Sequence, residues 1–283
     1  MNLISGNRCM TGEGPIWNPF NHKLYYVNAL GENEIYILDI ERGECLVQKL
    51  PFRVTAMGFA QDGRMLGSCE DGVFYLNEDH TREPLYDMSR YEILYGNDGK
   101  VGPDGRFYVG TQSKARKRVG HEVDGKLYCI DKNGMVKVLL DGLSLSNGLE
   151  WSMDEKRFYH TDSDTGLIKE YAFDKQRGEI DFTGRSIVVP GVDGFTIDEN
   201  DKLYVACWGY ARLAVVNTVD LKIESYIPVP AKNPASCGFA GTEMEKLVVV
   251  TSKLGVDLEI DRNAGFTYFC EVETRGRAPF LFG

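Results

Sequence analysis

The sequence lacks several features that would assign a chain of 283 residues to a common class. No apolar run approaches the roughly 18 residues that a membrane-spanning helix needs. The first residues, MNLISGNRCMTGEGP, show no basic segment followed by an apolar core, which argues against a secretory signal. We therefore expect a cytoplasmic protein that does not associate with membranes.

Cysteine motifs and excess positive charge are also missing. The seven cysteines are scattered and odd in number, and none forms a CxxC motif, so neither a zinc cluster nor a disulfide framework is expected. Reduced thiols are typical of the cytosol. Lys and Arg number 32 against 42 Asp and Glu, which gives a net charge of -10. Because non-specific binding to nucleic acid or acidic membranes needs a basic surface, neither partner is expected.

A sustained helical period is absent as well. Short runs rich in Val, Ile, Tyr and Phe alternate instead with Gly, Asn and Asp turns, a pattern typical of β-strands. Only three Trp are present and no GH…WD pairing occurs, so WD-repeat and kelch propellers fit poorly. No glycine-rich phosphate loop follows a strand and opens a helix, and nucleotide binding therefore has no support.

A turn closed by Lys or Arg and followed at once by a strand-like run recurs six times. The intervals between these turns range from 41 to 51 residues. An all-strand repeat of this length is typical of a propeller blade, and six blades account for the chain. The sequence thus predicts an all-β protein, a single six-bladed β-propeller over residues 1–283 with four antiparallel strands per blade. The turn residues are Lys23, Arg64, Arg106, Arg157, Lys202 and Lys246.

One position per blade lies nine or ten residues before each turn, at the predicted start of the innermost strand. Because innermost strands converge on the channel of a propeller, these positions should meet in space. Carboxylate and amide oxygens among them suit Ca²⁺, Mg²⁺ or Mn²⁺, and three protein ligands leave places for water and substrate. Each residue alone could equally cap a strand, but the shared register favours a site. The six positions are Glu13, Thr55, Asn97, Asn147, Asp193 and Cys237.

Two long connections are expected at the same end of the channel. In an antiparallel blade, the connection between the second and third strands returns to the end where the innermost strand begins. Residues 111–125 and 251–265 form unusually long connections of this kind. Long loops are often functional, so we expect both to overhang the ring of polar residues.

Five segments, in order along nearly the whole chain, resemble the fingerprint of the gluconolactonase, regucalcin and luciferin-regenerating enzyme family. They are GEGPIW (12–17), NDGKVGPDGRFYVGT (97–111), LSNGLEWSMDEKRFYHTDS (145–163), DGFTIDENDKLYVACW (193–208) and SCGFAGTEMEKLVVVTS (236–252). Five dispersed motifs in the same order are far more specific than a single short motif.

The resemblance implies a propeller with one divalent cation (Ca²⁺, Zn²⁺, Mn²⁺ or Mg²⁺) at the channel mouth. It makes Glu13, Asn147 and Asp193 the metal ligands, Asn97 a substrate contact and Asp193 the catalytic base. The implied reaction is metal-dependent opening of a sugar lactone to the aldonic acid, in which the cation polarises the ester carbonyl and a carboxylate takes a proton from water. By strand alternation, Asp98 should point away from the channel axis.

Two departures from the family pattern concern the substrate. Many family members have Arg two residues before the substrate-contacting Asn, where this chain has Tyr95. The third-blade loop, QSKARKRVGHE, is basic, and it is either a solvated surface or part of the substrate site. In the second interpretation its side chains bind an anionic group, as in a phospho-, sulfo- or uronic-type aldonolactone. The candidate residues are Lys114, Arg116, Arg118 and His121.

Two other functions remain open at this point. A non-catalytic calcium-binding or regulatory propeller would use the same oxygen ligands without turning over a lactone. A propeller esterase or phosphotriesterase would use the cation to polarise a different C=O or P=O group.

Overall fold

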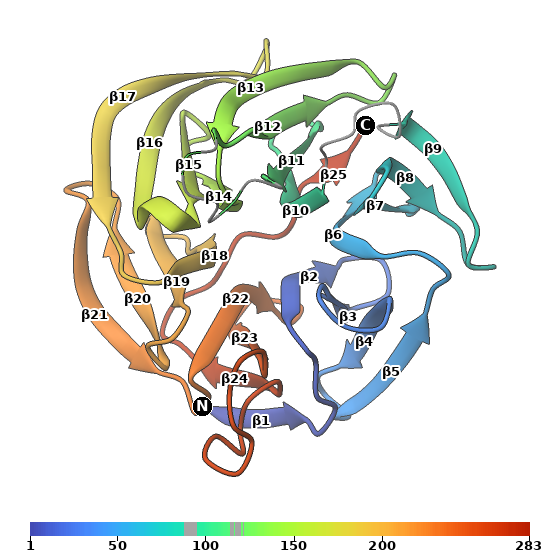
Figure 1. Ribbon diagram of the computed structural model, residues 1–283, viewed down its shortest axis with the longest axis vertical. Coiled ribbons are helices and arrows are strands. Elements are labelled where there is room, and N and C mark those ends of the chain that lie inside the picture. The colour runs from blue at the N-terminus through green and yellow to red at the C-terminus, as the bar shows by residue number, and fades with distance from the viewer. Residues whose placement is uncertain (88–94, 114–115, 117–119, 121) are drawn as a thin grey trace.

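The computed structural model describes all residues except 88–94, 114–115, 117–119 and 121, and of Tyr95 only the backbone. The described chain forms six sheets arranged as a ring around a central channel (Figure 1). A single 3-10 turn, η1 (Ser163–Thr165), interrupts the strands in this part of the chain. No helix of the described residues is long and apolar enough to cross a membrane. The predicted six-bladed, all-β propeller is confirmed.

Each blade has four strands in antiparallel order from the channel outward. The innermost strands are β2 (Gly12–Asn18), β6 (Val54–Ala60), β10 (Tyr95–Val101), β14 (Ser146–Trp151), β18 (Val192–Ile197) and β22 (Asn233–Ala240). The second strands are β3 (Lys23–Asn28), β7 (Met65–Cys69), β11 (Phe107–Gln112), β15 (Arg157–Asp162), β19 (Lys202–Cys207) and β23 (Lys246–Ser252). The third strands are β4 (Glu34–Asp39), β8 (Gly72–Leu76), β12 (Gly125–Ile130), β16 (Leu167–Asp174), β20 (Arg212–Asn217) and β24 (Thr267–Glu271). The outermost strands are β5 (Glu44–Lys49), β9 (Arg82–Asp87), β13 (Val136–Leu143), β17 (Glu179–Val188), β21 (Lys222–Pro228) and β1 (Asn2–Ser5).

The two chain ends depart from a simple repeat. The outermost strand of the sixth blade is β1, which pairs with β24, rather than a segment that follows β24 as the repeat predicted. The residues after β24 instead cross the middle of the ring, drawn in red in Figure 1, and end in β25 (Leu281–Phe282). This last strand joins the second blade, parallel to β6. The N-terminal strand therefore closes the ring, whereas the C-terminal segment ties the sixth blade to the second.

Four of the six Lys or Arg turns, those of the second to fifth blades, close with the same backbone hydrogen bond. In the second and third blades, the backbone N–H groups of Ala60 and Gly102 donate to the carbonyls of Arg64 and Arg106, each at 2.8 Å. Each turn also contains at least one residue with positive φ, a conformation that glycine adopts freely. These residues are His22, Gly63, Gly105, Glu155, Asp201 and, in the sixth blade, Gly241 and Met244.

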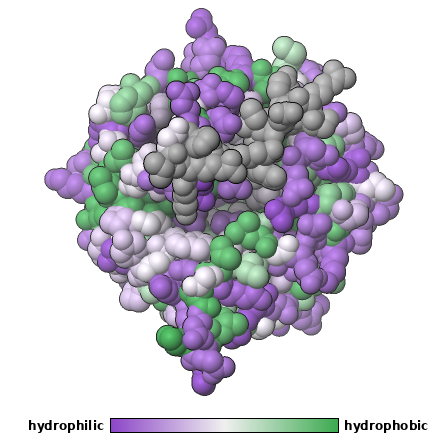
Figure 2. Space-filling view, in the orientation of Figure 1, coloured by the Kyte–Doolittle hydropathy of each residue, from purple (hydrophilic) through white to green (hydrophobic). Residues whose placement is uncertain are grey.

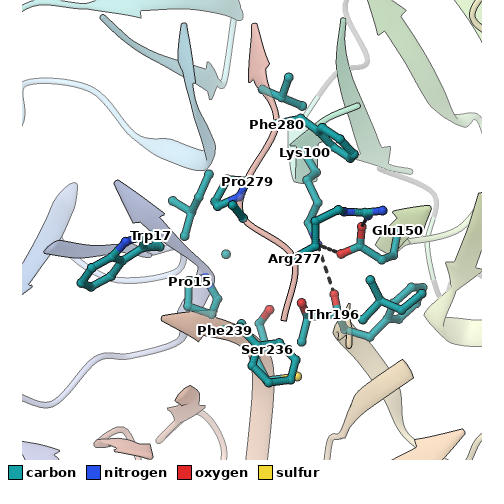
Figure 3. Close-up of a pocket in the computed structure, with 18 of the residues that line it drawn as sticks. Pro15, Trp17, Lys100, Glu150, Thr196, Ser236, Phe239, Arg277, Pro279 and Phe280 are labelled. Carbon is teal, nitrogen blue, oxygen red and sulfur yellow. Dashed lines mark hydrogen bonds and ion pairs between the residues drawn. The ribbon is translucent and has the colours of Figure 1, made fainter. Parts of the chain in front are cut away.

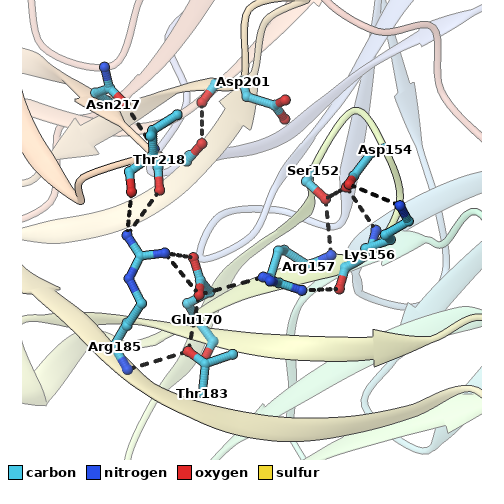
Figure 4. Close-up of polar contacts among 11 residues, drawn as sticks. Ser152, Asp154, Lys156, Arg157, Glu170, Thr183, Arg185, Asp201, Asn217 and Thr218 are labelled. Atoms are coloured by element: carbon cyan, nitrogen blue, oxygen red, sulfur yellow. Dashed lines mark hydrogen bonds and ion pairs between the residues drawn. The ribbon is translucent and has the colours of Figure 1, made fainter.

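Neighbouring blades are joined by aromatic and polar contacts. Tyr108 of the third blade meets Trp151 of the fourth edge to face, with ring centroids 4.9 Å apart. Between the fourth and fifth blades, Arg185 pairs with buried Glu170 at 2.9 Å and donates to the carbonyl of Val219 at 2.6 Å (Figure 4). The described part of the face viewed in Figure 2 mixes hydrophilic and hydrophobic residues. The Tyr108–Trp151 contact and the contacts of Arg185 fix the third, fourth and fifth blades relative to one another.

Candidate active site

A pocket of about 360 Å³ lies at the end of the channel where the innermost strands begin. Five of the six predicted ring positions line this one pocket, although they come from five different blades. They are Glu13, Thr55, Asn97, Asn147 and Asp193. Cys237 is the exception. The register of the sequence repeat therefore identified most of the pocket floor.

Every innermost strand has a β-bulge or a similar irregularity near its start. The register shifts lie between Glu13 and Ile16, Val54 and Ala56, Gly96 and Gly99, Asn147 and Leu149, Val192 and Phe195, and Pro234 and Ser236. A bulge bends its strand and changes the direction of the side chains beside it. Six bulges at one level of the ring are therefore the local structure that builds the site.

Glycines permit two of these bulges where the blades come closest. A Cβ at Gly148, next to Asn147, would lie 2.3 Å from the Phe195 ring and 2.5 Å from the Asp193 carbonyl oxygen. A Cβ at Gly194, next to Asp193, would lie 2.2 Å from the Ser236 hydroxyl. Larger residues at either position would push the blades apart. The Asn-Gly and Asp-Gly pairs are thus a sequence signal that could have strengthened the site prediction.

Two carboxylates on the pocket floor form no ion pair with a described side chain, although the charge of Arg116 acts on one of them, Asp193. Burial raises the pKa of both Glu13 and Asp193 well above their ordinary values, and the negative charges of Asp193 and Asp98 raise that of Glu13 further. Asp193 accepts a hydrogen bond from Asn147 Nδ2, but neither carboxylate forms an ion pair with a described side chain. Buried charge without a partner is unfavourable, so this floor would be stabilised by a cation.

The donor set fits a hard divalent cation. Glu13 and Asp193 supply carboxylate oxygens, and Asn147 supplies an amide oxygen if its side chain turns so that Oδ1, rather than Nδ2, faces Asp193. In the described part of the chain, no cluster of three or more His, Cys, Asp or Glu side chains could hold a metal ion. The candidate metal site therefore depends on this mixed set of two carboxylates and one amide.

Asn97 is held in place from the neighbouring blade. Its Nδ2 donates to the carbonyl of Ser146 at 2.8 Å, which leaves Oδ1 and a second N–H available on the pocket side. The Ser146 hydroxyl in turn lies 2.7 Å from Nε2 of His160. Burial lowers the pKa of His160 to about 3, so this ring is neutral. His160 thus supports the strand from behind and does not reach the pocket.

The long third-blade loop reaches the pocket through Arg116, as predicted. Its Nε and Nη2 donate to Asp164 at 2.7 and 2.9 Å, so the guanidinium is already paired. The other candidates from the loop, Lys114, Arg118 and His121, lie outside the described residues, and so does the side chain of Tyr95. The long sixth-blade loop contributes Leu254 to the pocket.

Two residues lie elsewhere than the sequence indicated. Cys237 lines a cavity of about 60 Å³ deeper in the channel. The bulge of β22 falls before Ser236, and the turn that follows this strand is longer than the others, so counting back from the turn stops too late. Asp98 lines the same cavity and does not point away from the axis, because the bulge between Gly96 and Gly99 breaks the strand alternation.

Several pocket residues were given no role by sequence reasoning, among them three with large polar or aromatic side chains. Arg53 and Glu70 come from the second blade, and Trp208 follows β19 in the fifth. A signal was available for Arg53, which stands two residues before the ring position Thr55, as Tyr95 stands two residues before Asn97. Trp208 ends the segment DGFTIDENDKLYVACW that carries the family resemblance, whereas no comparable signal marks Glu70.

Comparisons with known proteins agree with this architecture. Residues 11–253 match the family model described as SMP-30/Gluconolactonase/LRE-like region. A Bacillus subtilis protein that carries the provisional name sugar lactone lactonase YvrE is 30% identical, over 99% of this chain and 97% of its own. Regucalcin of Homo sapiens is 27% identical, over 97% and 95%.

Two solved structures have the same fold. A calcium-binding regucalcin from Agrobacterium tumefaciens has a TM-score of 0.90 at 23% identity, over 100% of this chain and 97% of that chain. A luciferin-regenerating enzyme has a TM-score of 0.88 at 23% identity, over 98% and 96%. At these identities the likeness concerns the fold alone.

Proposed function

Because the chain belongs to the SMP-30/gluconolactonase/LRE-like family, we propose that it is a cytoplasmic, divalent-cation-dependent hydrolase that opens a sugar lactone to its aldonic acid. The supporting observation is the pair of carboxylates, Glu13 and Asp193, that share the pocket floor without an ion-pairing side chain among the described residues. A neutral lactone and a divalent cation together would match the charge of this floor.

The residues of the floor divide the chemistry between them. Glu13, Asn147 and Asp193 would hold the cation, which when bound polarises the lactone carbonyl and lowers the pKa of water. Asp193 also accepts the proton of the attacking water on a carboxylate oxygen. It returns this proton to the ring oxygen as the acyl C–O bond breaks, so the reaction balances. Asn97 orients the lactone through the amide atoms that its bond to Ser146 leaves free.

The proposal extends to a lactone that carries an anionic group, such as a phospho-, sulfo- or uronic-type aldonolactone. Arg116 is paired with Asp164, so Lys114, Arg118 and His121 would supply much of the binding.

Changing Lys114, Arg116 and Arg118 together to Ala should raise KM about tenfold or more for an anionic lactone, since each lost charge-assisted hydrogen bond weakens binding. Lys132→Ala, at an exposed turn of the same blade, is the control. Equal effects on neutral and anionic lactones would refute this extension.

The main proposal is tested with protein stripped by a chelator and reloaded with Ca²⁺, Mn²⁺, Mg²⁺ or Zn²⁺. Proton release is measured with neutral and anionic aldonolactones and compared with the uncatalysed rate. We expect cation-dependent opening of at least one lactone, and its loss in Asp193→Asn. Cation binding without opening of any lactone would instead indicate a calcium-binding protein. Turnover of aryl esters or phosphotriesters alone would indicate the third function.

A further inference from the structure

Among the described residues two arginines line the pocket, and they differ in what they bind. Arg116 makes two short hydrogen bonds to Asp164. Arg53 makes one loose contact, in which Nη1 lies 3.4 Å from Oε1 of Glu70. No described atom accepts a hydrogen bond from the enclosed Nε of Arg53. The guanidinium of Arg53 therefore keeps most of its donors, whereas that of Arg116 is occupied.

A structural role does not explain Arg53. The same blade contains a structural arginine, Arg82, which donates to Asp71 at 2.6 and 2.8 Å and lies 4.1 Å from the centre of the Phe74 ring. In the described part of the chain, Arg53 has neither a bidentate partner nor a stacking contact of this kind. Its side chain is 32% exposed and that of Glu70 is 51% exposed, and both line the pocket. Both heads can therefore be reached by a ligand.

The position of this pair relative to the floor also matters. Arg53 precedes the ring residue Thr55 by two residues, and the innermost strands begin at the pocket mouth. The pair thus lies nearer the mouth than Glu13 and Asp193. A lactone whose carbonyl meets the floor would present its ring substituents to Arg53 and Glu70.

We infer that Arg53 and Glu70 form a recognition pair that determines specificity by binding two hydroxyl groups of a polyhydroxylated lactone ring. An arginine only donates and an ionised glutamate only accepts, whereas a hydroxyl group does both. One substrate hydroxyl oxygen accepts from Arg53, and one hydroxyl hydrogen is donated to Glu70. Because Glu70 would repel an anion, the pair selects neutral hydroxyls. The inference rests on the proposed function and adds that this part of the pocket binds the ring hydroxyl groups of the substrate.

The test compares two lactones that share the reacting ester. Gluconolactone carries ring hydroxyls, and δ-valerolactone has none. Arg53→Met and Glu70→Gln should each raise KM for gluconolactone about 10- to 100-fold, the range for a hydrogen bond to a charged group, and leave kcat nearly unchanged. KM for δ-valerolactone should change less than about twofold, since it cannot make these bonds. Lys49→Met, which removes a surface ion pair with Glu32, is the matched control.

A binding measurement separates failure of this inference from failure of the proposed hydrolysis. 1,5-Anhydroglucitol has the hydroxylated ring but no carbonyl, and its binding can be titrated by calorimetry in wild type and both variants. Weakened binding in Arg53→Met and Glu70→Gln supports the pair even if no lactone is opened. Equal KM effects on both lactones, unchanged binding of 1,5-anhydroglucitol, or a loss confined to an anionic lactone would each overturn the inference.

Discussion

Glu13 and Asp193 at one end of the central channel and Glu150 at the other are buried carboxylates in opposite electrostatic settings. At the pocket end, Glu13 and Asp193 have no ion pair with a described side chain. Burial raises the pKa of each, the charges of Asp193 and Asp98 raise that of Glu13 further, and the charge of Asp98 raises that of Asp193. At the other end, Glu150 lies 2.7 Å from Lys100 and also pairs with Arg277 (Figure 3). Burial would raise the pKa of Glu150 too, but Lys100 and Arg277 lower it below its ordinary value.

The difference shows at which end the described chain supplies the countercharge for a buried carboxylate itself. Arg277 belongs to the C-terminal segment that crosses the ring, and with Pro279 and Phe280 it leaves a cavity of only about 60 Å³ (Figure 3). The opposite end keeps about 360 Å³, and its carboxylates form no ion pair with a side chain that the structure describes. The same kind of buried acid is therefore structural at one end, and at the other it is suited to an added cation.

The end of the channel with the pocket of about 360 Å³ is called the open end below, and the end with Glu150 and Arg277 the closed end. The largest effect should come from changing the open end. Asp193→Asn removes the proposed base and one metal ligand, so kcat/KM should fall by about 10²- to 10⁴-fold, the usual contribution of a positioned acid or base. The variant should nevertheless be at least as stable as wild type without cation, because one of two repelling charges is gone. Steady-state kinetics and thermal unfolding of the stripped protein check both results. Retained turnover, or a strongly destabilised apo form, would remove the distinction between the two ends.

The closed end should respond in the opposite way. Arg277→Met leaves Glu150 with Lys100 alone and removes hydrogen bonds to the carbonyls of Ser152 and Trp151, each of 3.0 Å. Breaking a buried ion pair from one side costs about 3 kcal/mol or more, so the free energy of unfolding should fall by roughly this amount. The affinity for a divalent cation, measured by calorimetry below the unfolding temperature, should change by less than about twofold. Such a change corresponds to about 0.4 kcal/mol of binding free energy. A large loss of cation affinity would show that the ends are coupled.

Much of the open end could be predicted because it follows from backbone register. Glu13, Asn97, Asn147 and Asp193 meet since each stands at nearly the same distance from the Lys or Arg turn of its blade. The rule fails where the backbone is irregular. Cys237 is displaced because the bulge of the sixth blade falls before Ser236 and the turn of that blade is longer.

The closed end and the Arg53–Glu70 pair could not be found by register. Arg277 reaches Glu150 only because the C-terminal segment turns across the channel, and no repeat describes that segment. Arg53 and Glu70 lie on different connections of one blade, and their contact depends on side-chain conformation. Sequence periodicity carries information about strand positions, whereas long-range partners of flexible side chains need the folded structure.

The smallest effect, and the one that compares both ends in a single experiment, is the pH dependence of stability. A carboxyl group with a raised folded-state pKa stabilises the fold below its unfolded pKa, near 4.5 for Glu13 and 3.8 for Asp193, and this contribution is lost as pH rises through the folded pKa. Glu150 behaves oppositely: its contribution to stability is present above its unfolded pKa and is lost as pH falls through the lowered folded pKa.

Protein stripped of cation should therefore become more stable as pH falls from neutral toward about 5, a range that stays above the unfolded pKa values of both Glu13 and Asp193. A saturating divalent cation should raise stability most at neutral pH, by about 2.7 kcal/mol at one hundred times its Kd, and so flatten this slope. Asp193→Asn should flatten it without cation, while Arg277→Met should leave it in place. If stripped wild-type protein lost stability over this range instead, the unpaired carboxylates could not be the groups that distinguish the open end.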